Sequence, residues 1–363
     1  MPGAEADLDI LLTAEGLFDL SPDDIRELRL RHIGESLEFH LAANSAYRRY
    51  CESVSYEPDG LMGYHKLDSL PLMPVSLFKR TPDRVASEVD GKILETTSSG
   101  TMGTVSRVPR DDLTLTRFFA TISVAIRELM GIERFDMPLF NLGPADIEYT
   151  WASYVLSGIA VFFPSTAYTW DGACHTALAL EDLRNLPPDR PAVVIGPPFL
   201  LLELATEAAR TGAPALPDSS WVMTVGGWKR FTGAIPPEEF ARTVGTALGV
   251  APERIRDTYN MVEVNSVIVE CERRVKHIPP WLYVRARHPR TLAVMPSGAK
   301  GVLSFLDPTP RSYPGYLLSE DIGIVYEDFA CGCGRTTDAV EIVRRVNRVE
   351  SRGCALRIEA MTE

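Results

Sequence analysis

The stretch Glu95-Thr96-Thr97-Ser98-Ser99-Gly100-Thr101-Met102-Gly103-Thr104 decides how the rest of this sequence is interpreted. An apolar, β-prone lead-in precedes it, and a helical pattern begins after Pro109-Arg110. Hydroxyl side chains supply short donors and glycines let backbone N–H groups approach a polyanion, so such a loop can surround phosphate oxygens. The residues predicted to do so are Thr97, Ser98, Ser99, Gly100, Thr101, Gly103 and Thr104.

Two other interpretations of this stretch are available. It is not the P-loop of nucleoside triphosphatases, because no Gly-Lys-Ser/Thr follows with the Gly-x-x-x-x spacing. An ordinary surface loop rich in serine, threonine and glycine is the remaining alternative. The motifs elsewhere in the chain must therefore decide.

Length and composition exclude several classes of protein. At 363 residues, with 45% hydrophobic and 24% charged residues, the chain is long enough for one large or two modest globular domains. The formal net charge of −12 argues against general nucleic-acid binding and against attachment to anionic membranes. The apolar runs are too short to span a bilayer, and the N-terminus has no positive region of a secretory signal. We therefore expect a cytoplasmic protein.

The order of apolar segments predicts the fold class. A helix is expected from about Asp111 to Met130, and β-runs then alternate with amphipathic helices up to residue 259, including a strand over 159–163. This alternation indicates a layered α/β core with parallel strands. Beyond Ser266 the segments become β-rich. We expect an α/β core over 1–265 with N-terminal helices in 1–65, a β-rich subdomain over 266–340 and a short tail over 341–363.

A glycine pair marks the end of one predicted strand. Val225-Gly226-Gly227-Trp228-Lys229 lies where open α/β sheets bind ligands, beyond the carboxyl end of a strand. The glycines permit close approach to a flat ring, and Lys229 can meet a phosphate or a carboxylate. A tight turn with a surface lysine is the alternative.

Acidic residues in two later motifs are further candidates. In Tyr259-Asn260-Met261-Val262-Glu263, the tyrosine can stack on a base and Glu263 can bind Mg²⁺, which prefers oxygen ligands. Asp321, which precedes Ile322-Gly323, can accept hydrogen bonds from both hydroxyls of a ribose. The alternatives are a core tyrosine with a surface glutamate, and an acid in a β-turn.

Taken together and in this order, these pieces resemble the adenylate-forming superfamily. Within it the sequence is most similar to the acyl-protein synthetase (LuxE) family, which is related to the phenylacetate–CoA ligases. The resemblance covers roughly residues 65 to 360, and the ordered set of motifs is more specific than any one of them. The motifs are Phe78-Lys79, Thr97–Gly103, Gly226–Lys229, Tyr259–Glu263, His277-Ile278-Pro279-Pro280-Trp281, Glu320-Asp321-Ile322-Gly323 and Arg352-Gly353-Cys354.

The resemblance implies the fold of adenylate-forming enzymes and a two-step reaction. A carboxylate attacks the α-phosphate of ATP to give an acyl-adenylate and pyrophosphate, and a thiol then takes the acyl group. The loop would hold phosphates, Glu263 would hold Mg²⁺, and Lys229 would stabilise the developing charge. The resemblance also places the nucleotide at Gly226, Gly227, Trp228, Tyr259, Asn260, Asp321 and Arg345.

The end of the sequence departs from the wider superfamily. Arg345-Val346-Asn347 and Arg352-Gly353 resemble the hinge before a mobile C-terminal domain that usually carries a catalytic lysine, but only ten residues follow Gly353. We therefore expect that domain to be strongly truncated. In the acyl-protein synthetases a near-terminal cysteine receives the acyl group, so Cys354 is the candidate nucleophile. An unreactive tail thiol is the alternative.

Four late residues have the chemistry of a metal site. Cys271 and His277 have five residues between them, and Cys331 and Cys333 form a second close pair. Two pairs of sulfur and nitrogen ligands on separate hairpins predict a closed, structural zinc site. The spacings differ from those of common zinc fingers, and reduced cysteines beside a surface histidine are the alternative.

We therefore expect an enzyme that activates a fatty or aromatic carboxylic acid with ATP and Mg²⁺. The acyl group would pass to Cys354 and then to a partner acyl reductase. Two alternatives remain open at this point. One is an acid–thiol ligase that uses coenzyme A as acceptor, and the other is a nucleotide-binding protein without catalytic activity.

Overall fold

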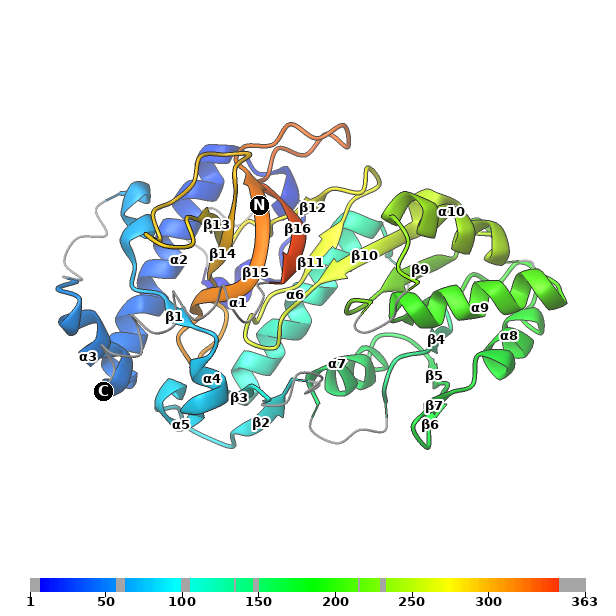
Figure 1. Cartoon of the computed structure of the whole chain (residues 1–363), viewed down its shortest axis with the longest axis horizontal. Coiled ribbons are helices and arrows are strands. Elements are labelled where there is room, and N and C mark those ends of the chain that lie inside the picture. Colours follow the sequence, from blue (N-terminus) through cyan, green and yellow to red (C-terminus); the bar gives the residue numbers. More distant parts are fainter. Residues whose placement is uncertain are drawn as a thin grey trace. The chain divides into compact units, whose positions relative to one another are not determined.

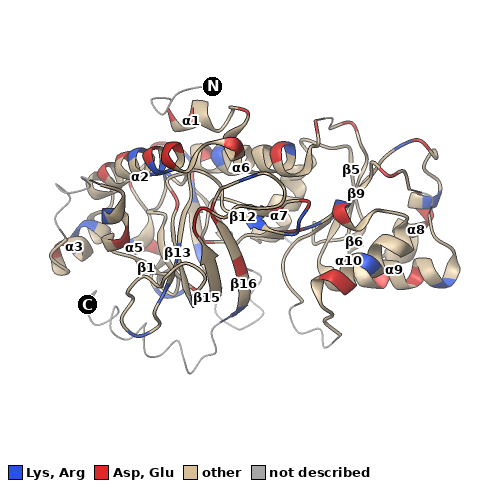
Figure 2. Ribbon diagram, turned by 90° about the horizontal axis from the view of Figure 1, so that it is seen from above, with Lys and Arg blue, Asp and Glu red and all other residues tan. Residues whose placement is uncertain are grey.

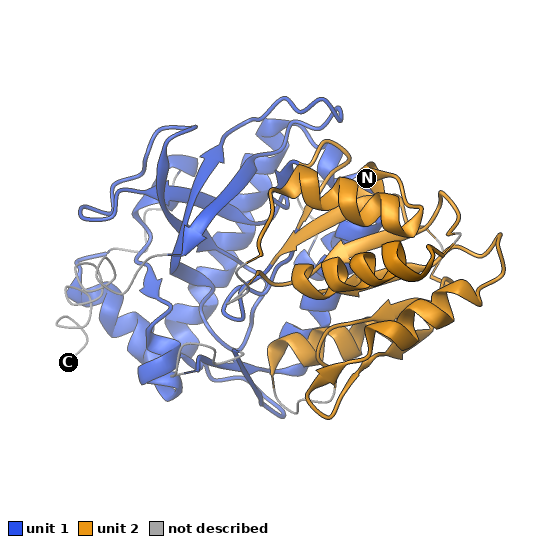
Figure 3. Cartoon of the chain, turned by 45° about the vertical axis from the view of Figure 1, so that its right-hand side comes forward, with its two compact units in different colours: residues 1–128, 260–268, 275–363 blue, residues 129–259, 269–274 orange. Residues whose placement is uncertain are grey.

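The computed structural model describes residues 7–56, 63–98, 105–133, 135–145, 150–214, 216–228 and 233–345. The chain separates into two compact units, shown in different colours in Figure 3. Unit 1 comprises residues 1–128, 260–268 and 275–363, and unit 2 comprises residues 129–259 and 269–274. The sequence predicts boundaries at residues 265 and 340, because the segments between them are β-rich. These boundaries stay predictions.

Unit 1 is built on antiparallel strands. The strands β13 (Tyr283–Arg287), β14 (Lys300–Leu306), β15 (Tyr316–Tyr326) and β16 (Ala339–Arg345) lie side by side, and β12 (Lys276–His277) pairs with β16 (Figure 1). The short β1 (Met73–Pro74) adds to β15 in parallel, and β2 (Leu94–Thr97) forms a separate hairpin with β3 (Arg107–Arg110). The helices of this unit are α1 (Leu8–Leu11), α2 (Pro22–Ala43), α3 (Ser45–Ser53), α4 (Leu77–Arg80), α5 (Pro82–Val85) and α6 (Asp112–Met130).

The longest helix, α2, begins where its sequence signals predict. Ser21 accepts a hydrogen bond from the backbone N–H of Asp24, and Pro22 occupies the first helical position, where a missing N–H costs nothing. Acidic and basic residues both occur along the exposed side of α2 (Figure 2), where Arg31 pairs with Glu35 at 2.9 Å. Such exposed pairs contribute little, about 0.3–0.5 kcal/mol each. The buried stripe of the helix therefore supplies most of its stability.

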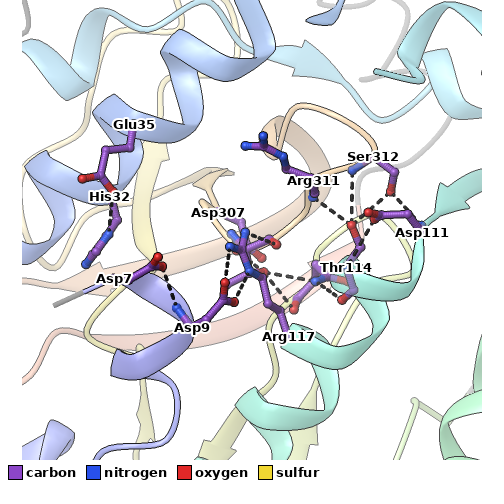
Figure 4. Close-up of polar contacts among 12 residues, drawn as sticks. Asp7, Asp9, His32, Glu35, Asp111, Thr114, Arg117, Asp307, Arg311 and Ser312 are labelled. Carbon is purple, nitrogen blue, oxygen red and sulfur yellow. Dashed lines mark hydrogen bonds and ion pairs between the residues drawn. The ribbon is translucent and has the colours of Figure 1, made fainter. Parts of the chain in front are cut away.

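A group of polar side chains joins α6 to the loop before β15. The hydroxyl of Thr114 accepts hydrogen bonds from the backbone N–H groups of Arg311 and Ser312, at 2.8 and 3.2 Å (Figure 4). Arg117 binds both carboxylate oxygens of Asp9, at 2.6 and 3.0 Å. The bonds to Thr114 satisfy backbone groups of a loop that forms neither helix nor strand, and so help to fix its path through unit 1.

A buried ion pair fixes α2 to the residues before β16. Nη1 of Arg29 lies 2.6 Å from Oδ2 of Asp338, and the two residues are 1% and 5% exposed. Burial by itself would raise the pKa of Asp338, but the charge of Arg29, the N–H of Asp328 and the charge of Arg285 together lower it below 3.8. Arg29 also donates to the hydroxyl of Tyr64 and the carbonyl of Pro280.

Replacing Asp338 by asparagine should destabilise the protein by about 3 kcal/mol, because the substitution leaves the buried guanidinium of Arg29 without its counter-charge. Urea denaturation of the wild type and of D338N at neutral pH measures this difference. The matched control is D328N, because Asp328 pairs with Arg26 at the surface, where the expected loss is below about 1 kcal/mol. Equal effects of the two substitutions would contradict the prediction.

The same variant has a defined pH dependence. Since the folded pKa of Asp338 lies below the unfolded value of 3.8, the pair contributes fully above that value. Its contribution is lost as the pH falls below 3.8 and through the lower folded pKa. The difference in unfolding free energy between wild type and D338N should therefore stay constant down to pH 3.8 and narrow only below it.

Unit 2 is a parallel α/β layer. Its strands run in the order β10 (Ile255–Tyr259), β9 (Trp221–Thr224), β8 (Val193–Gly196), β4 (Leu139–Asn141) and β5 (Ser165–Ala167), and every pair is parallel. The helices α8 (Thr176–Arg184), α9 (Pro198–Thr211) and α10 (Pro237–Leu248) pack with these strands in one hydrophobic core. The sequence prediction of alternating strands and helices is thus confirmed for this unit. Its other elements are α7 (Trp151–Ile159), β6 (Thr169–Trp170) and β7 (Ala173–Cys174), while β11 (Ile268–Glu270) begins in unit 1.

The strand expected over 159–163 is wrong. Ile159 ends α7, residues 160–163 form turns, and the strand β5 begins only at Ser165. The side chain of Thr150 caps α7 by accepting from the N–H of Ser153 at 3.4 Å, which starts a helix that continues through the apolar run. A short apolar run fits a buried helix end as well as a strand, so its pattern alone could not decide. Among the described residues, no helix is long and apolar enough to cross a membrane.

Candidate functional site

The hairpin β2–β3 presents the base of the predicted phosphate loop. Thr97 ends β2 and Ser98 follows it, whereas Ser99, Gly100, Thr101, Gly103 and Thr104 lie outside the described residues. The N–H of Ser98 donates to the carbonyl of Ser106 at 3.1 Å, and the N–H of Ser106 donates to Oγ of Ser98 at 3.0 Å. Two hydrogen bonds therefore join residues 98 and 106, and this pair of bonds is called the clasp below.

A buried carboxylate lies against this clasp. Glu263 is 3% exposed, and its Oε1 accepts a hydrogen bond from the hydroxyl of Ser106 at 2.5 Å. Burial raises the pKa of Glu263, and the bond from Ser106 and the charges of Lys79 and Arg345 oppose that rise only in part. Burial makes the ionised form of Glu263 costly, and a cation bound to it would offset that cost. The structure thus brings Glu263 to the base of the predicted loop.

Two neighbouring acids of β15 are held by basic side chains. Oε2 of Glu320 lies 2.9 Å from Nζ of Lys79 and 3.4 Å from Nη2 of Arg345. Asp321 faces Arg345 across the β15–β16 ladder, with 3.9 Å between Oδ1 and Nε. The N–H of Asp321 donates to the hydroxyl of Ser319 at 3.0 Å, which fixes the backbone there. Glu320 thereby links Lys79 to Arg345, and Arg345 in turn faces Asp321.

In unit 2 the glycine pair and Tyr259 share one edge. The strands β9 and β10 are adjacent and parallel, so Gly226, just after β9, and Tyr259, the last residue of β10, both lie at the carboxyl edge. Gly226 has a φ of 70°, which glycine adopts without strain. A Cβ added to Gly227 would meet no described atom within 4 Å, so packing within unit 2 does not require a glycine there. Trp228 packs edge-on against Phe240, with 5.8 Å between ring centroids.

The predicted metal ligands form one group. The ligand atoms of Cys271, His277, Cys331 and Cys333 all lie within 4.8 Å of one another. Nδ1 of His277 hydrogen-bonds the hydroxyl of Thr337 at 2.8 Å, while Nε2 lies 3.4 Å from Sγ of Cys333. The first three residues are buried and Cys333 is half-buried.

The turns around the cysteines suit thiolate ligands. The N–H of Arg273 points to Sγ of Cys271 at 3.3 Å, a contact that favours a negatively charged sulfur. The N–H of Gly334 donates to the carbonyl of Cys331 at 3.0 Å, and the φ of 95° at Gly334 makes this turn tight. The group can hold a cation in a closed, four-ligand arrangement.

Two further predicted site residues, Lys229 and Cys354, lie outside the described part of the chain. Asn260 is described, and its side-chain amide donates to the carbonyls of Val264 and Ser266, both at 3.0 Å. The roles expected for these three residues stay predictions.

Ser106, Glu320 and Arg110 were missed as site residues. Arg110 is fully buried and donates to the hydroxyl of Thr96 and to the carbonyl of Val262. Ser106 and Glu263 are 157 positions apart, and Lys79 and Glu320 are 241 apart. No local pattern connects such distant residues. The one available signal was the motif Phe78-Lys79, which the sequence analysis quoted without giving the lysine a role.

The family model for "Acyl-protein synthetase, LuxE" matches residues 3–362. Among curated proteins, a long-chain-fatty-acid–luciferin-component ligase of Aliivibrio fischeri is 31% identical over 97% of this chain and 93% of its own length. A protein of the same name from Vibrio harveyi is 29% identical, with 91% and 87% covered.

Among solved structures, 2-hydroxyisobutyryl-CoA ligase in an open conformation, in complex with 2-HIB-AMP and CoA, superposes with a TM-score of 0.69. It is 17% identical, and the match covers 89% of this chain and 70% of that one. At this identity the likeness shows the fold alone. The α/β fold of adenylate-forming enzymes expected from the sequence is thereby confirmed.

Proposed function

The chain belongs to the acyl-protein synthetase (LuxE) family of adenylate-forming acid ligases, and from this premise we propose that it activates a carboxylic acid with ATP and transfers the acyl group to a thiol. In the first step a carboxylate oxygen of the acid attacks the α-phosphorus of ATP, and pyrophosphate leaves. In the second step a thiolate attacks the carbonyl carbon of the acyl-adenylate, and AMP leaves. The adenylate is needed because a carboxylate oxygen is a poor leaving group until it is phosphorylated.

One observation carries this proposal within the structure. The buried carboxylate of Glu263 accepts a hydrogen bond from Ser106, the residue directly before β3. A cation bound by Glu263 would then lie near phosphates held by the loop. The raised pKa of Glu263 and its oxygen donor fit Mg²⁺, which neutralises phosphate charge and orients the α-phosphate when it is bound. We propose Glu263 as a Mg²⁺ ligand on this basis.

The remaining nucleotide contacts are proposed from the edge of unit 2 and from β15. The open space beside Gly227 fits close approach of a flat ring, with Tyr259 on the neighbouring strand positioned to stack on it. Asp321, whose backbone Ser319 fixes, would accept from ribose hydroxyls. Lys229 would stabilise the charge that develops on the acyl phosphate. These assignments extend the family resemblance residue by residue.

We propose Cys354 as the thiol that receives the acyl group. Arg345, the last described residue, lies near Glu320 and Asp321, and nine residues lead from it to Cys354. Nine residues span at most about 30 Å when fully extended. The chain is therefore long enough for Cys354 to reach Asp321 and its neighbours, and an acyl group on it would be passed to a partner acyl reductase.

We also propose that Cys271, His277, Cys331 and Cys333 bind one structural zinc ion. Their clustering, the burial of three of them and the bond from His277 to Thr337 support this, because an imidazole held through Nδ1 presents Nε2 to a metal. A tetrahedral zinc with Zn–S distances of about 2.3 Å spaces its sulfurs about 3.8 Å apart, which is compatible with the limit of 4.8 Å. All ligands come from the protein, so the ion would stabilise the fold and leave catalysis to other groups.

The names of the relatives make long-chain fatty acids the first substrates to test, with aromatic acids as the second class. Coenzyme A is the alternative acceptor, and a partner reductase and a cytoplasmic location belong to the same proposal.

The proposal is tested by acid-dependent exchange of labelled pyrophosphate into ATP in the presence of Mg²⁺. We expect exchange with at least one member of a panel of saturated fatty acids and benzoic acids, and none without acid. Exchange depends only on the first step, so it needs neither Cys354 nor a partner. Absence of exchange with every acid, in a protein that still binds ATP, would favour the non-catalytic alternative.

A further inference from the structure

The hairpin β2–β3 does more than present a loop, because it also fixes the segment that carries Glu263. Arg110, on β3, donates through Nη2 to the carbonyl of Val262 and through Nη1 to Thr96 on β2. Arg110 and Thr96 are both fully buried. Two residues beyond Glu263, the carbonyl of Asn265 accepts a hydrogen bond from the hydroxyl of the buried Thr309 at 3.2 Å. The backbone on both sides of Glu263 is therefore held by hydrogen bonds from buried side chains.

The carboxylate itself takes a hydrogen bond from the backbone of Glu263. The hydroxyl of Ser106 adds a side-chain constraint, since it donates to Oε1 of Glu263 at 2.5 Å. Ser106 is 1% exposed, and its own N–H is fixed by Ser98. The two hydrogen bonds with Ser98 therefore hold the backbone of the residue that carries the donor.

We propose that Ser106 is a positioning residue that orients the carboxylate of Glu263 toward Mg²⁺. This inference rests on the proposed function, in which Glu263 is a Mg²⁺ ligand. Mg²⁺ demands nearly ideal octahedral geometry, so a carboxylate that can rotate binds it less well than one held in place. Groups that orient a metal ligand are worth roughly 10–100-fold in metal affinity.

The test measures binding rather than turnover. The affinity for ATP is determined by calorimetry with Mg²⁺ and with EDTA, for the wild type and for S106A. We expect Mg²⁺ to strengthen ATP binding by the wild type, and S106A to lose roughly 10-fold or more of that gain. ATP binding in EDTA should be nearly unchanged. Alanine keeps the backbone groups that bond to Ser98 and removes only the hydroxyl that bonds to Glu263.

A matched control separates this role from loss of stability. Ser87 is also a buried serine of unit 1, 5% exposed, and its hydroxyl lies 2.9 Å from Nδ1 of His40. S87A removes a comparable hydrogen bond away from Glu263, so it should lower the melting temperature about as much as S106A and leave the Mg²⁺ effect on ATP binding intact.

A double-mutant cycle tests the direction of the coupling. If Ser106 acts through Glu263, then S106A should cause no further loss of Mg²⁺-dependent binding in a protein that already carries E263Q. An additive loss, or an S106A variant with the full Mg²⁺ effect, would overturn the inference. Neither result depends on pyrophosphate exchange, so failure of the proposed function appears as a wild type without exchange, whatever the binding data show.

Discussion

The variant C354S is expected to form no stable acyl adduct, while its acid-dependent pyrophosphate exchange stays within about 2-fold of the wild type. Exchange requires only the first step, whereas the adduct requires a nucleophile that attacks the acyl-adenylate. A serine hydroxyl is a far weaker nucleophile than a thiolate at neutral pH, so we expect a loss of the adduct of more than about 100-fold. Intact-protein mass spectrometry after incubation with ATP, Mg²⁺ and the acid measures the adduct.

The chemistry of the adduct gives a second readout. A thioester is cleaved by neutral hydroxylamine, so the added mass on the wild type should disappear on that treatment. The matched control is C174S, since Cys174 is half-buried and burial raises the pKa of its thiol. Cys51 is no competitor either, because burial raises the pKa of its thiol to about 11.

The outcomes separate the alternatives for the acceptor. An adduct that persists in C354S would contradict the role of Cys354. A second outcome is that neither protein carries an adduct and an acyl-thioester of coenzyme A forms when coenzyme A is added. This result would identify coenzyme A, and not Cys354, as the acceptor. In that case the first step of the proposal stands and the second changes.

The variant C331S is expected to lose bound zinc and much of its stability. A closed structural site contributes its binding energy to folding, and this amounts to more than about 10 kcal/mol in small zinc peptides. In a chain of this size we expect a loss of several kcal/mol and a fall in melting temperature on the order of 5–10 °C. Elemental analysis of the purified protein and thermal denaturation with and without a chelator measure the two effects.

The zinc prediction has its own controls. The wild type should contain close to one zinc per chain, and prolonged chelation should lower its melting temperature toward that of C331S. C174S should keep both the metal and the stability, because Cys174 does not belong to the four-residue group. A wild type that is purified without metal and is insensitive to chelator would refute the site, and the four side chains would then pack as a reduced cluster.

Part of the candidate site follows from the sequence alone. Chemistry-bearing residues that are close in sequence, such as Gly226 and Gly227 after a strand, were identifiable because a local pattern places them at a known edge of an α/β sheet. Cys271 with His277 and Cys331 with Cys333 were likewise identifiable as candidate ligands, because sulfur and imidazole are ligands that zinc takes, and the zinc itself stays a prediction. The strand expected over 159–163 failed for the opposite reason, since an apolar run of five residues has no period that excludes a helix end.

The sequence by itself therefore determined the class of fold, the family and the order of the candidate motifs, because those depend on local periodicity and on residue types at fixed spacing. Only the tertiary structure decided which residues support those motifs. Ser106 meets Glu263, and Lys79 meets Glu320, across 157 and 241 positions of chain. Such contacts arise from the register of strands and the path of loops, which the packing of the whole unit sets and which no segment encodes alone.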